Sequence, residues 1–202
     1  MNSFAGFILA GGASSRMGTD KSRLVLEGRS FLARIHDSLS ALTNQVTIVG
    51  VPEERPNLYL PILPDVVAGW GALGGVHAAL SACKADWAIV VACDLPFVSA
   101  DLFSRLDSFK EGFEAVAPVQ RDGWPQPLCA FYRVIPCLAI AEQLIQSGER
   151  RPLTLLQSVR TRWVRFDEIN HLAGADRFFD NMNTPEDYAR ALEKTEREAP
   201  TS

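Results

Sequence analysis

The sequence has little of what marks metal centres and disulfide-rich proteins. It contains three histidines and four cysteines, and no two cysteines form a C-x-x-C pair. No histidine joins a cysteine pair in a zinc-ligand motif, so no metal-ligand spacing is present. We therefore interpret the cysteines as free, buried thiols of a protein in a reducing cytoplasm. They are Cys83, Cys93, Cys129 and Cys137.

Long apolar runs and basic runs are missing as well. The apolar run at 88–93 is interrupted within about ten residues, whereas a membrane span needs roughly 20. Residues 4–10 are as long as the apolar core of a signal peptide but lack the cationic segment that precedes such a core. The formal charge is -4, with no cluster of cations suited to a row of phosphates. We expect a cytoplasmic protein without a membrane or nucleic-acid partner.

What is present is an alternation of apolar runs with segments of helical periodicity. A chain of 202 residues, 47% of them hydrophobic, can bury one core. The nearly continuous apolar runs indicate strands covered on both faces, and hence an α/β fold with a mostly parallel sheet between two layers of helices. Strands are predicted at 4–10, 46–51, 88–93, 115–119, 128–133 and 162–166. Helices are predicted at 31–42, 73–83, 99–109, 136–146 and 185–192.

The domain organisation follows from the same pattern. Repeats and linkers rich in glycine, serine or proline are lacking, which favours a single domain over 1–193. The polar segment 194–202 is predicted to be a flexible tail.

A glycine pair follows the first predicted strand, in the segment L-A-G-G-A-S-S-R-M-G-T-D-K. Gly11 and Gly12 allow a sharp turn and a close approach of the backbone to a ligand, and Arg16 and Lys21 add two cations. Open parallel sheets bind ligands at the carboxyl ends of their strands. The spacing fails both G-x-x-x-x-G-K-[ST] and G-x-G-x-x-G, which excludes a P-loop and an ordinary dinucleotide site. We predict a phosphate-binding loop of another class; a surface turn with incidental charges is the alternative.

Two further segments follow predicted strands or precede helices. Asp94 ends the apolar run 88–93, where a carboxylate suits Mg²⁺ bound to triphosphate oxygens. The alternatives are a cap for helix 99–109 or a turn with Pro96. The glycines of 71–75, Gly71 and Gly75 among them, allow close approach to a base or ribose, and a tight turn without a ligand is the alternative.

Three polar side chains are candidates for recognition. A carboxylate such as that of Asp65 can accept two parallel hydrogen bonds from the guanine edge, beside backbone groups of Leu9 and Ala10. A solvated loop position is equally consistent with Asp65. Asn181 and Asn183 share one side of an extended segment and could face a phosphate or a metal, although Asn183 could also be a helix cap.

The motif L-A-G-G-x-S-x-R-M-G-x-D-K resembles the N-terminal motif of molybdenum cofactor guanylyltransferases, which belong to a wider group of nucleotidyltransferases with a GT-A-like, Rossmann-related fold. The resemblance continues in family order through C-D-L-P-F at 93–97, Q-P-L at 126–128 and N-M-N-T-P-E-D at 181–187, and spans residues 4–192. This chain has Ala72 where the family usually has proline. It has asparagines where related enzymes often have a second acidic metal ligand.

The resemblance implies a reaction and a set of residue roles. GMP would pass from GTP to the terminal phosphate of molybdenum-molybdopterin with release of pyrophosphate, with Mg²⁺ as cofactor. Proteins that make or receive the molybdenum cofactor are implied as partners. Alternatives are cytidylyl or other nucleotidyl transfer to a phosphorylated small molecule, or a non-catalytic nucleotide-binding protein.

The residues implied by the resemblance fall into three groups. The catalytic residues would be Arg16, Lys21 and Asp94, with Asp94 as the metal ligand. The nucleotide would contact Leu9, Ala10, Gly11, Gly12, Lys21, Asp65, Gly71, Gly75 and Asp94. The acceptor would contact Asn181 and Asn183, and the surroundings of Gln126, Pro127 and Arg133.

Overall fold

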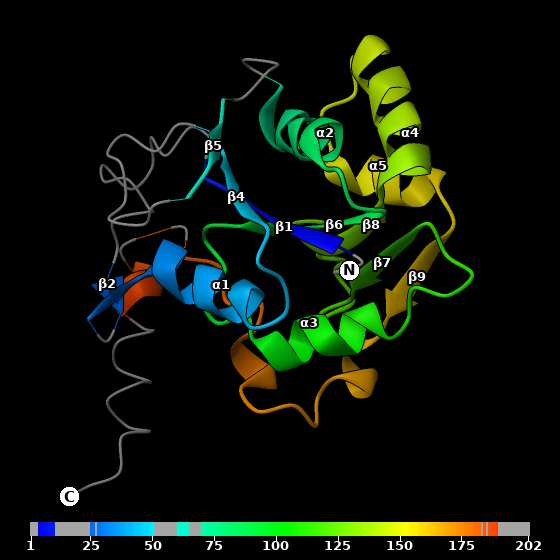
Figure 1. The fold of residues 1–202 in the computed structure, drawn as a ribbon. Helices are drawn as coiled ribbons and strands as arrows, with labels where there is room; N and C mark the ends of the chain where they lie inside the picture. The colour runs from blue at the N-terminus through cyan, green and yellow to red at the C-terminus, as the bar shows by residue number, and fades with distance from the viewer. Residues whose placement is uncertain are drawn as a thin grey trace, which may run out of the picture.

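A sheet of seven strands runs through the middle of the molecule (Figure 1), in the order β5-β4-β1-β6-β8-β7-β9. The computed structural model describes residues 4–10, 25–26, 28–50, 60–64, 70–182, 184 and 186–189. All strands of the sheet run in one direction except β8, which is antiparallel to both β6 and β7. The strands are β1 (Phe4–Leu9), β4 (Val46–Val49), β5 (Ile62–Leu63), β6 (Trp87–Ala92), β7 (Ala115–Pro118), β8 (Cys129–Arg133) and β9 (Thr161–Val164).

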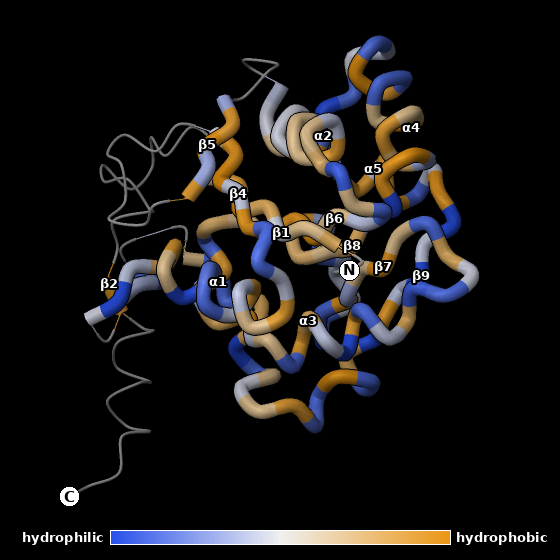
Figure 2. The backbone as a smooth tube through the Cα atoms, in the orientation of Figure 1, coloured by the Kyte–Doolittle hydropathy of each residue, from blue (hydrophilic) through white to orange (hydrophobic). Residues whose placement is uncertain are grey.

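Two layers of helices cover the sheet, as the alternation of apolar segments predicted. One face carries α1 (Phe31–Ser40) and α3 (Ala100–Asp107), and the other carries α2 (Gly71–Ala82), α4 (Val134–Gln146) and α5 (Pro152–Ser158). Because successive side chains of a strand point to opposite faces, each central strand contributes to both layers of the core. Figure 2 shows these strands as mostly hydrophobic between the two layers.

Strand β1 illustrates the sharing of the core. Its Ile8 packs in the core between the sheet and the layer of α1 and α3, while Phe7 and Leu9 pack in the core beneath α2. All six residues of β1 are buried. The continuous apolar run in the sequence is therefore explained by burial on both faces.

The helix boundaries follow local capping. Ser30 caps α1 by accepting a hydrogen bond from the Ala33 N–H at 3.2 Å, as predicted from its position. Ser99 caps α3 in the same way through the Leu102 N–H, also at 3.2 Å. Helix α4 begins at Val134 and not at 136, which leaves Pro136 in the first turn.

A small ribbon and the C-terminal segment form a third cluster beside α1. The ribbon pairs β2 (Val25–Leu26) with β3 (Arg29–Ser30) in antiparallel fashion. Leu26 and Met182 are buried against Phe31, and Tyr188 packs on the same group. Residues 186–189 are helical, within the predicted helix at 185–192.

The other predictions for the C-terminal end lie outside the described residues, including the tail at 194–202. No helix among the described residues has the length and apolar character that crossing a membrane requires.

Candidate functional site

The carboxyl ends of four neighbouring strands meet at one edge of the sheet. The Cys93 N–H, just after β6, donates to the Leu9 carbonyl at 3.0 Å, and the Ala10 N–H donates to the Val49 carbonyl at 2.9 Å. The Gly50 N–H donates to Leu63 at 2.9 Å, which brings the end of β5 to the same edge. This is the edge where open parallel sheets bind their ligands.

The predicted phosphate loop follows Ala10 directly along the chain. Its residues Gly11, Gly12, Arg16 and Lys21 lie outside the described residues, and so does Asp65, two residues after β5. Leu9 buries its side chain against α2 and uses its carbonyl in the sheet. Its predicted contact with the nucleotide would therefore come from the main chain.

Asp94 lies at this edge, in a turn closed by the Leu95 N–H donating to the Ala92 carbonyl at 3.2 Å. The carbonyl of Asp94 accepts a hydrogen bond from the Met182 N–H at 3.0 Å. This turn spans residues 92–95 and does not include Pro96, and the cap of α3 is Ser99, so neither structural alternative for Asp94 is present in the form predicted. Asp94 is half-buried at a strand end, and its predicted role as a metal ligand stays a prediction.

Helix α1 holds the loop that carries Asp94. The Arg34 Nε donates to the Pro96 carbonyl at 3.3 Å, and the Ser38 hydroxyl donates to the Val98 carbonyl at 2.9 Å. On the other side, the Arg177 guanidinium lies 3.9 Å from the centre of the Phe97 ring. Side chains from two distant parts of the chain thus fix the main chain on the C-terminal side of Asp94.

Asn181 is brought next to Asp94 by its neighbour. Met182 is 3% exposed, so its side chain anchors the segment while its N–H bonds Asp94. Thr184 and Asp187 exchange main-chain to side-chain hydrogen bonds of 3.0 and 3.1 Å, which is the pattern of a capping box. The cap of the following helix is therefore Thr184; Asn183 lies outside the described residues.

The glycine segment 71–75 is the first turn of α2, where we predicted a turn before a helix beginning at 73. Gly71 has φ +61°, a conformation that favours glycine. Within the described part of the chain, no side chain caps this helix end and no acidic residue lies in its first turn. The N–H groups of a first turn lack helical partners and attract anions, which suits the predicted nucleotide contact.

Gly75 has a packing role that its sequence position did not reveal. A Cβ built on Gly75 would lie 3.2 Å from Cδ1 of Leu9 and 3.3 Å from Cδ2. The absence of a side chain lets α2 approach the end of β1 closely. The start of α2 therefore lies over the same edge of the sheet as Asp94.

The reversed direction of β8 decides where the remaining candidates lie. The Leu128 carbonyl accepts from the Ala92 N–H at 2.9 Å, so Gln126 and Pro127, just before it, lie on the Asp94 side. Gln126 is only 9% exposed, and its N–H donates to Pro118 at 2.9 Å. Arg133 pairs with Trp87 at the other end of β8 and is separated from this group.

Trp124 also lies at this edge and was not among the candidate residues predicted from the sequence. It follows the tip of the hairpin between β7 and β8 and is 66% exposed. The tip is ordered by the Gln120 N–H donating to the Trp124 carbonyl at 2.9 Å, with Gly123 at φ +89°. The Asp122-Gly123 pair between two predicted strands was the available signal, because such pairs favour hairpin turns.

The cysteines are free, as predicted, but only two of the four are fully buried. Burial raises the pKa of Cys129 and of Cys137 to about 12, which leaves both as neutral thiols at physiological pH. Cys83 and Cys93 are half-buried.

Residues 6–161 match the protein family described as MobA-like NTP transferase domain. The "Probable molybdenum cofactor guanylyltransferase" of Pelotomaculum thermopropionicum is 34% identical to this chain over 188 residues, covering 92% of this chain and 90% of that protein.

Two solved structures show the same architecture. The molybdopterin-guanine dinucleotide biosynthesis protein A from Archaeoglobus fulgidus superimposes with a TM-score of 0.80 at 26% identity, covering 96% of this chain and 99% of the other. The 2-C-methyl-D-erythritol 4-phosphate cytidylyltransferase from Thermus thermophilus gives 0.69 at 16% identity, covering 94% and 98%. The second likeness establishes a shared fold alone. The predicted GT-A-like, three-layer fold is thus confirmed.

Proposed function

This chain belongs to the family of MobA-like NTP transferase domains, and on that premise we propose that it transfers GMP from GTP to the terminal phosphate of molybdenum-molybdopterin. The products are molybdopterin guanine dinucleotide and pyrophosphate. The observation that carries the proposal is the meeting of Asp94 with the Asn181–Met182 segment at the carboxyl edge, next to the end of β1. The relatives named as guanylyltransferases match this chain over nearly its whole length.

The two substrates are assigned to the two sides of Asp94. The nucleotide lies on the side of β1, β4 and β5, where the glycine loop begins and the first turn of α2 offers its N–H groups. The acceptor is assigned to the surroundings of Asn181, Asn183 and the segment that holds Gln126, of which Gln126 lies on the side of β8. Asp94 lies between these sides because β6 separates β1 from β8 in the sheet.

The chemistry is an in-line displacement at the α-phosphorus of GTP. An oxygen of the acceptor's terminal phosphate forms the new P–O bond, and the bond to the pyrophosphate group breaks. A phosphate monoester is largely ionised at neutral pH, so the attack needs no general base. The chain contributes alignment and charge neutralisation, through Arg16 and Lys21 of the glycine loop.

Mg²⁺ is the proposed cofactor, and the donor chemistry at this edge fits it. Asp94 offers a hard carboxylate oxygen at a strand end, and Mg²⁺ typically takes one or two carboxylates together with phosphate oxygens and water. When bound, the ion would neutralise charge on the triphosphate. Asp94 would hold it, and Asn181 would offer a neighbouring neutral oxygen.

Base choice is assigned to Asp65, which follows β5, with main-chain groups near Leu9 and Ala10. Its carboxylate matches the paired N1–H and N2–H₂ donors of guanine, whereas adenine would present an acceptor at N1. An unsatisfied polar partner costs about 1–3 kcal/mol, or roughly tenfold to over a hundredfold in discrimination. We expect Asp65→Ala to lose the preference for GTP more than its competence to transfer.

The test is pyrophosphate release with molybdenum-molybdopterin and GTP, CTP or ATP, measured as kcat/KM for the parent and for Asp65→Ala. A parent that prefers CTP would replace the guanylyltransferase proposal with a cytidylyltransferase. Absence of pyrophosphate with every nucleotide would make the chain a non-catalytic binding protein. An unchanged GTP:CTP ratio in the variant would assign base recognition to the main chain alone.

The proposal also bears on location and partners. The four free cysteines fit the reducing cytoplasm, where we place the protein. The dinucleotide product is a cofactor, so we propose that the chain contacts proteins that make molybdenum-molybdopterin or receive the product.

A further inference from the structure

A cleft of about 350 Å³ opens at the amino edge of the sheet, at the opposite ends of the strands from Asp94. Trp87, at the start of β6, and Arg133, at the end of β8, line it together with Arg160, which precedes β9. The turn between α3 and β7 supplies Glu111 and its neighbours. Strand β6 runs from Trp87 to Ala92, a length of about 17 Å at 3.3 Å per residue, before the turn that carries Asp94. This cleft is therefore separate from the proposed active site.

One residue fixes the main chain of both arginines. The Glu114 carbonyl accepts a hydrogen bond from the Arg133 N–H at 2.8 Å, and the Glu114 carboxylate accepts from the Arg160 N–H at 2.8 Å. The Arg160 carbonyl in turn accepts from the Glu114 N–H at 2.8 Å. The two arginines are thus held at the mouth of one cleft by the ordered start of β7.

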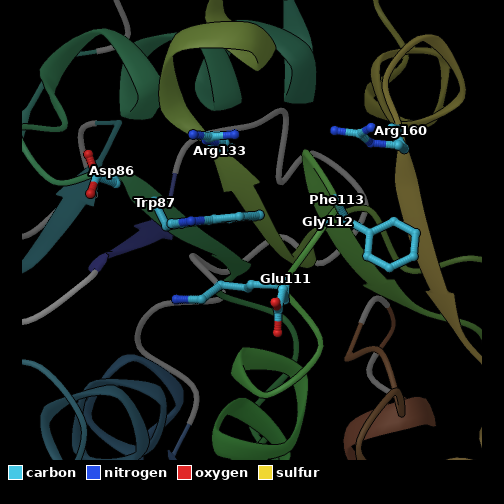
Figure 3. Close-up of a pocket in the computed structure, with 8 residues that line it drawn as sticks. Asp86, Trp87, Glu111, Gly112, Phe113, Arg133 and Arg160 are labelled. Carbon is cyan, nitrogen blue, oxygen red and sulfur yellow. The ribbon is translucent and has the colours of Figure 1, made fainter.

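The positively and negatively charged side chains lie on different sides of the cleft. In Figure 3 the guanidinium group of Arg160 extends toward Arg133, and both groups lie above the Trp87 ring in the view. The carboxylate of Glu111 points to the other side of that ring, and Asp86 lies at the margin with its carboxylate turned outward. The positive charge is therefore concentrated on the side formed by the two arginines.

The third cation of the cleft, Lys110, interacts with other groups of the protein. Lys110 forms an ion pair with Asp107, and its Nζ lies 5.3 Å from the centre of the Trp87 ring and 5.2 Å from the rings of Phe4 and Phe131. It stabilises the floor of the cleft and is not counted among the groups that bind a ligand.

Arg133 and Arg160 differ from every other arginine that the structure describes. The others each have a carboxylate, a carbonyl or an aromatic ring as partner for the guanidinium; they are Arg29, Arg34, Arg105, Arg121, Arg150, Arg151, Arg162, Arg165 and Arg177. Among the described residues, the guanidinium groups of Arg133 and Arg160 have no hydrogen bond, ion pair or ring contact. Both unpaired groups face the same cleft.

From this arrangement we propose that the cleft is a second binding site, for a small molecule that carries phosphate groups. Two guanidinium groups offer forked N–H donors that match the terminal oxygens of a phosphate, and two such groups suit a diphosphate better than a single carboxylate. The volume lies at the lower end of the range for small-molecule sites. The site is independent of the reaction proposed above.

Trp87 provides the reporter for the test. The chain has four tryptophans, so a ¹⁵N-labelled sample gives four indole N–H signals, and Trp87→Phe assigns the relevant one. Inorganic pyrophosphate is titrated into the full-length protein at constant ionic strength in the absence of Mg²⁺. We expect the Trp87 signal to shift saturably. The pyrophosphate concentration at the midpoint of this shift should rise at least tenfold in the Arg133→Gln/Arg160→Gln double variant, which keeps most of the side-chain length and removes the charge.

Two controls separate this site from general anion binding. Arg150→Gln removes an exposed arginine whose guanidinium contacts Trp70 elsewhere, and its midpoint should match that of the parent. Citrate tests whether carboxylates suffice, and it should bind at least tenfold more weakly than pyrophosphate. A Trp87 signal that does not move, an unchanged midpoint in the double variant, or tighter binding of citrate would each overturn the proposal.

Discussion

Replacing Gly75 by alanine sets two opposing free-energy changes against each other. Alanine is the better helix former by about 1 kcal/mol, which by itself would stabilise α2. The new Cβ, however, would lie 3.2 Å and 3.3 Å from the two methyl carbons of Leu9, inside the ordinary carbon–carbon contact distance of about 3.5–4.0 Å.

Leu9 has little room to yield, because it is 7% exposed and belongs to the core beneath α2. Overpacking of this kind costs about 1–3 kcal/mol, so we expect Gly75→Ala to lower the free energy of unfolding by about 1 kcal/mol. In a domain of this size that corresponds to a fall of about 2–4 °C in the melting temperature.

A second substitution should reverse the sign of the stability change caused by Gly75→Ala. Leu9→Ala removes the methyl groups that the new Cβ meets, at its own cost of about 2–5 kcal/mol. In that background Gly75→Ala should be stabilising, because only the gain in helix propensity remains. Urea unfolding of the four proteins in this double-mutant cycle measures the coupling. A destabilising effect of Gly75→Ala in both backgrounds would refute the role assigned to Leu9.

Three further predictions concern charge. Lys21→Ala should reduce turnover by about 10²–10³ with an unchanged melting temperature, because it removes a charge proposed to contact the triphosphate; parental turnover at saturating GTP would remove Lys21 from the mechanism. Asp94→Asn should weaken both activity and its dependence on Mg²⁺, and a magnesium titration identical to the parent's would leave Asp94 a structural turn residue. Hydrogen bonds from Arg151, Arg150 and Thr154 hold the pKa of Glu149 well below its usual value. The ionised carboxylate therefore stabilises the fold fully above the unfolded pKa of about 4.5, and this stabilisation is lost as the pH falls below it. Glu149→Gln should therefore lower the melting temperature at pH 7, by an amount that shrinks toward about pH 3; a difference independent of pH would contradict this.

The strands were predictable where burial on both faces left a continuous apolar run. The run W-A-I-V-V-A of β6 is such a case, and its end correctly placed Asp94 at the carboxyl edge of the sheet. Strand β5 has two residues and α5 has seven, so neither is long enough to show a period. The start of α2 was misplaced because glycine is a poor helix former, and the contact of Gly75 with Leu9 lies outside any local pattern.

Strand direction could not be predicted from the apolar pattern. A buried strand has the same side-chain pattern whether it runs with its neighbours or against them. Gln126 and Arg133 were therefore grouped as neighbours of one acceptor site, although β8 places them at opposite edges of the sheet. The approach of Asn181 to Asp94 was likewise hidden, because it depends on Met182 fitting into a cluster with Leu26 and Phe31.

The hydrogen bond from Met182 to Asp94 ties the structure of the carboxyl edge to the order in which the chain is synthesised. All seven strands of the sheet precede Met182 along the chain. A nascent or truncated polypeptide that ends before Met182 already contains every strand, yet lacks the donor that holds the Asp94 carbonyl and the side chain that seats Asn181. Assembly of the sheet is thus separated from completion of this edge, which requires synthesis to have passed Met182.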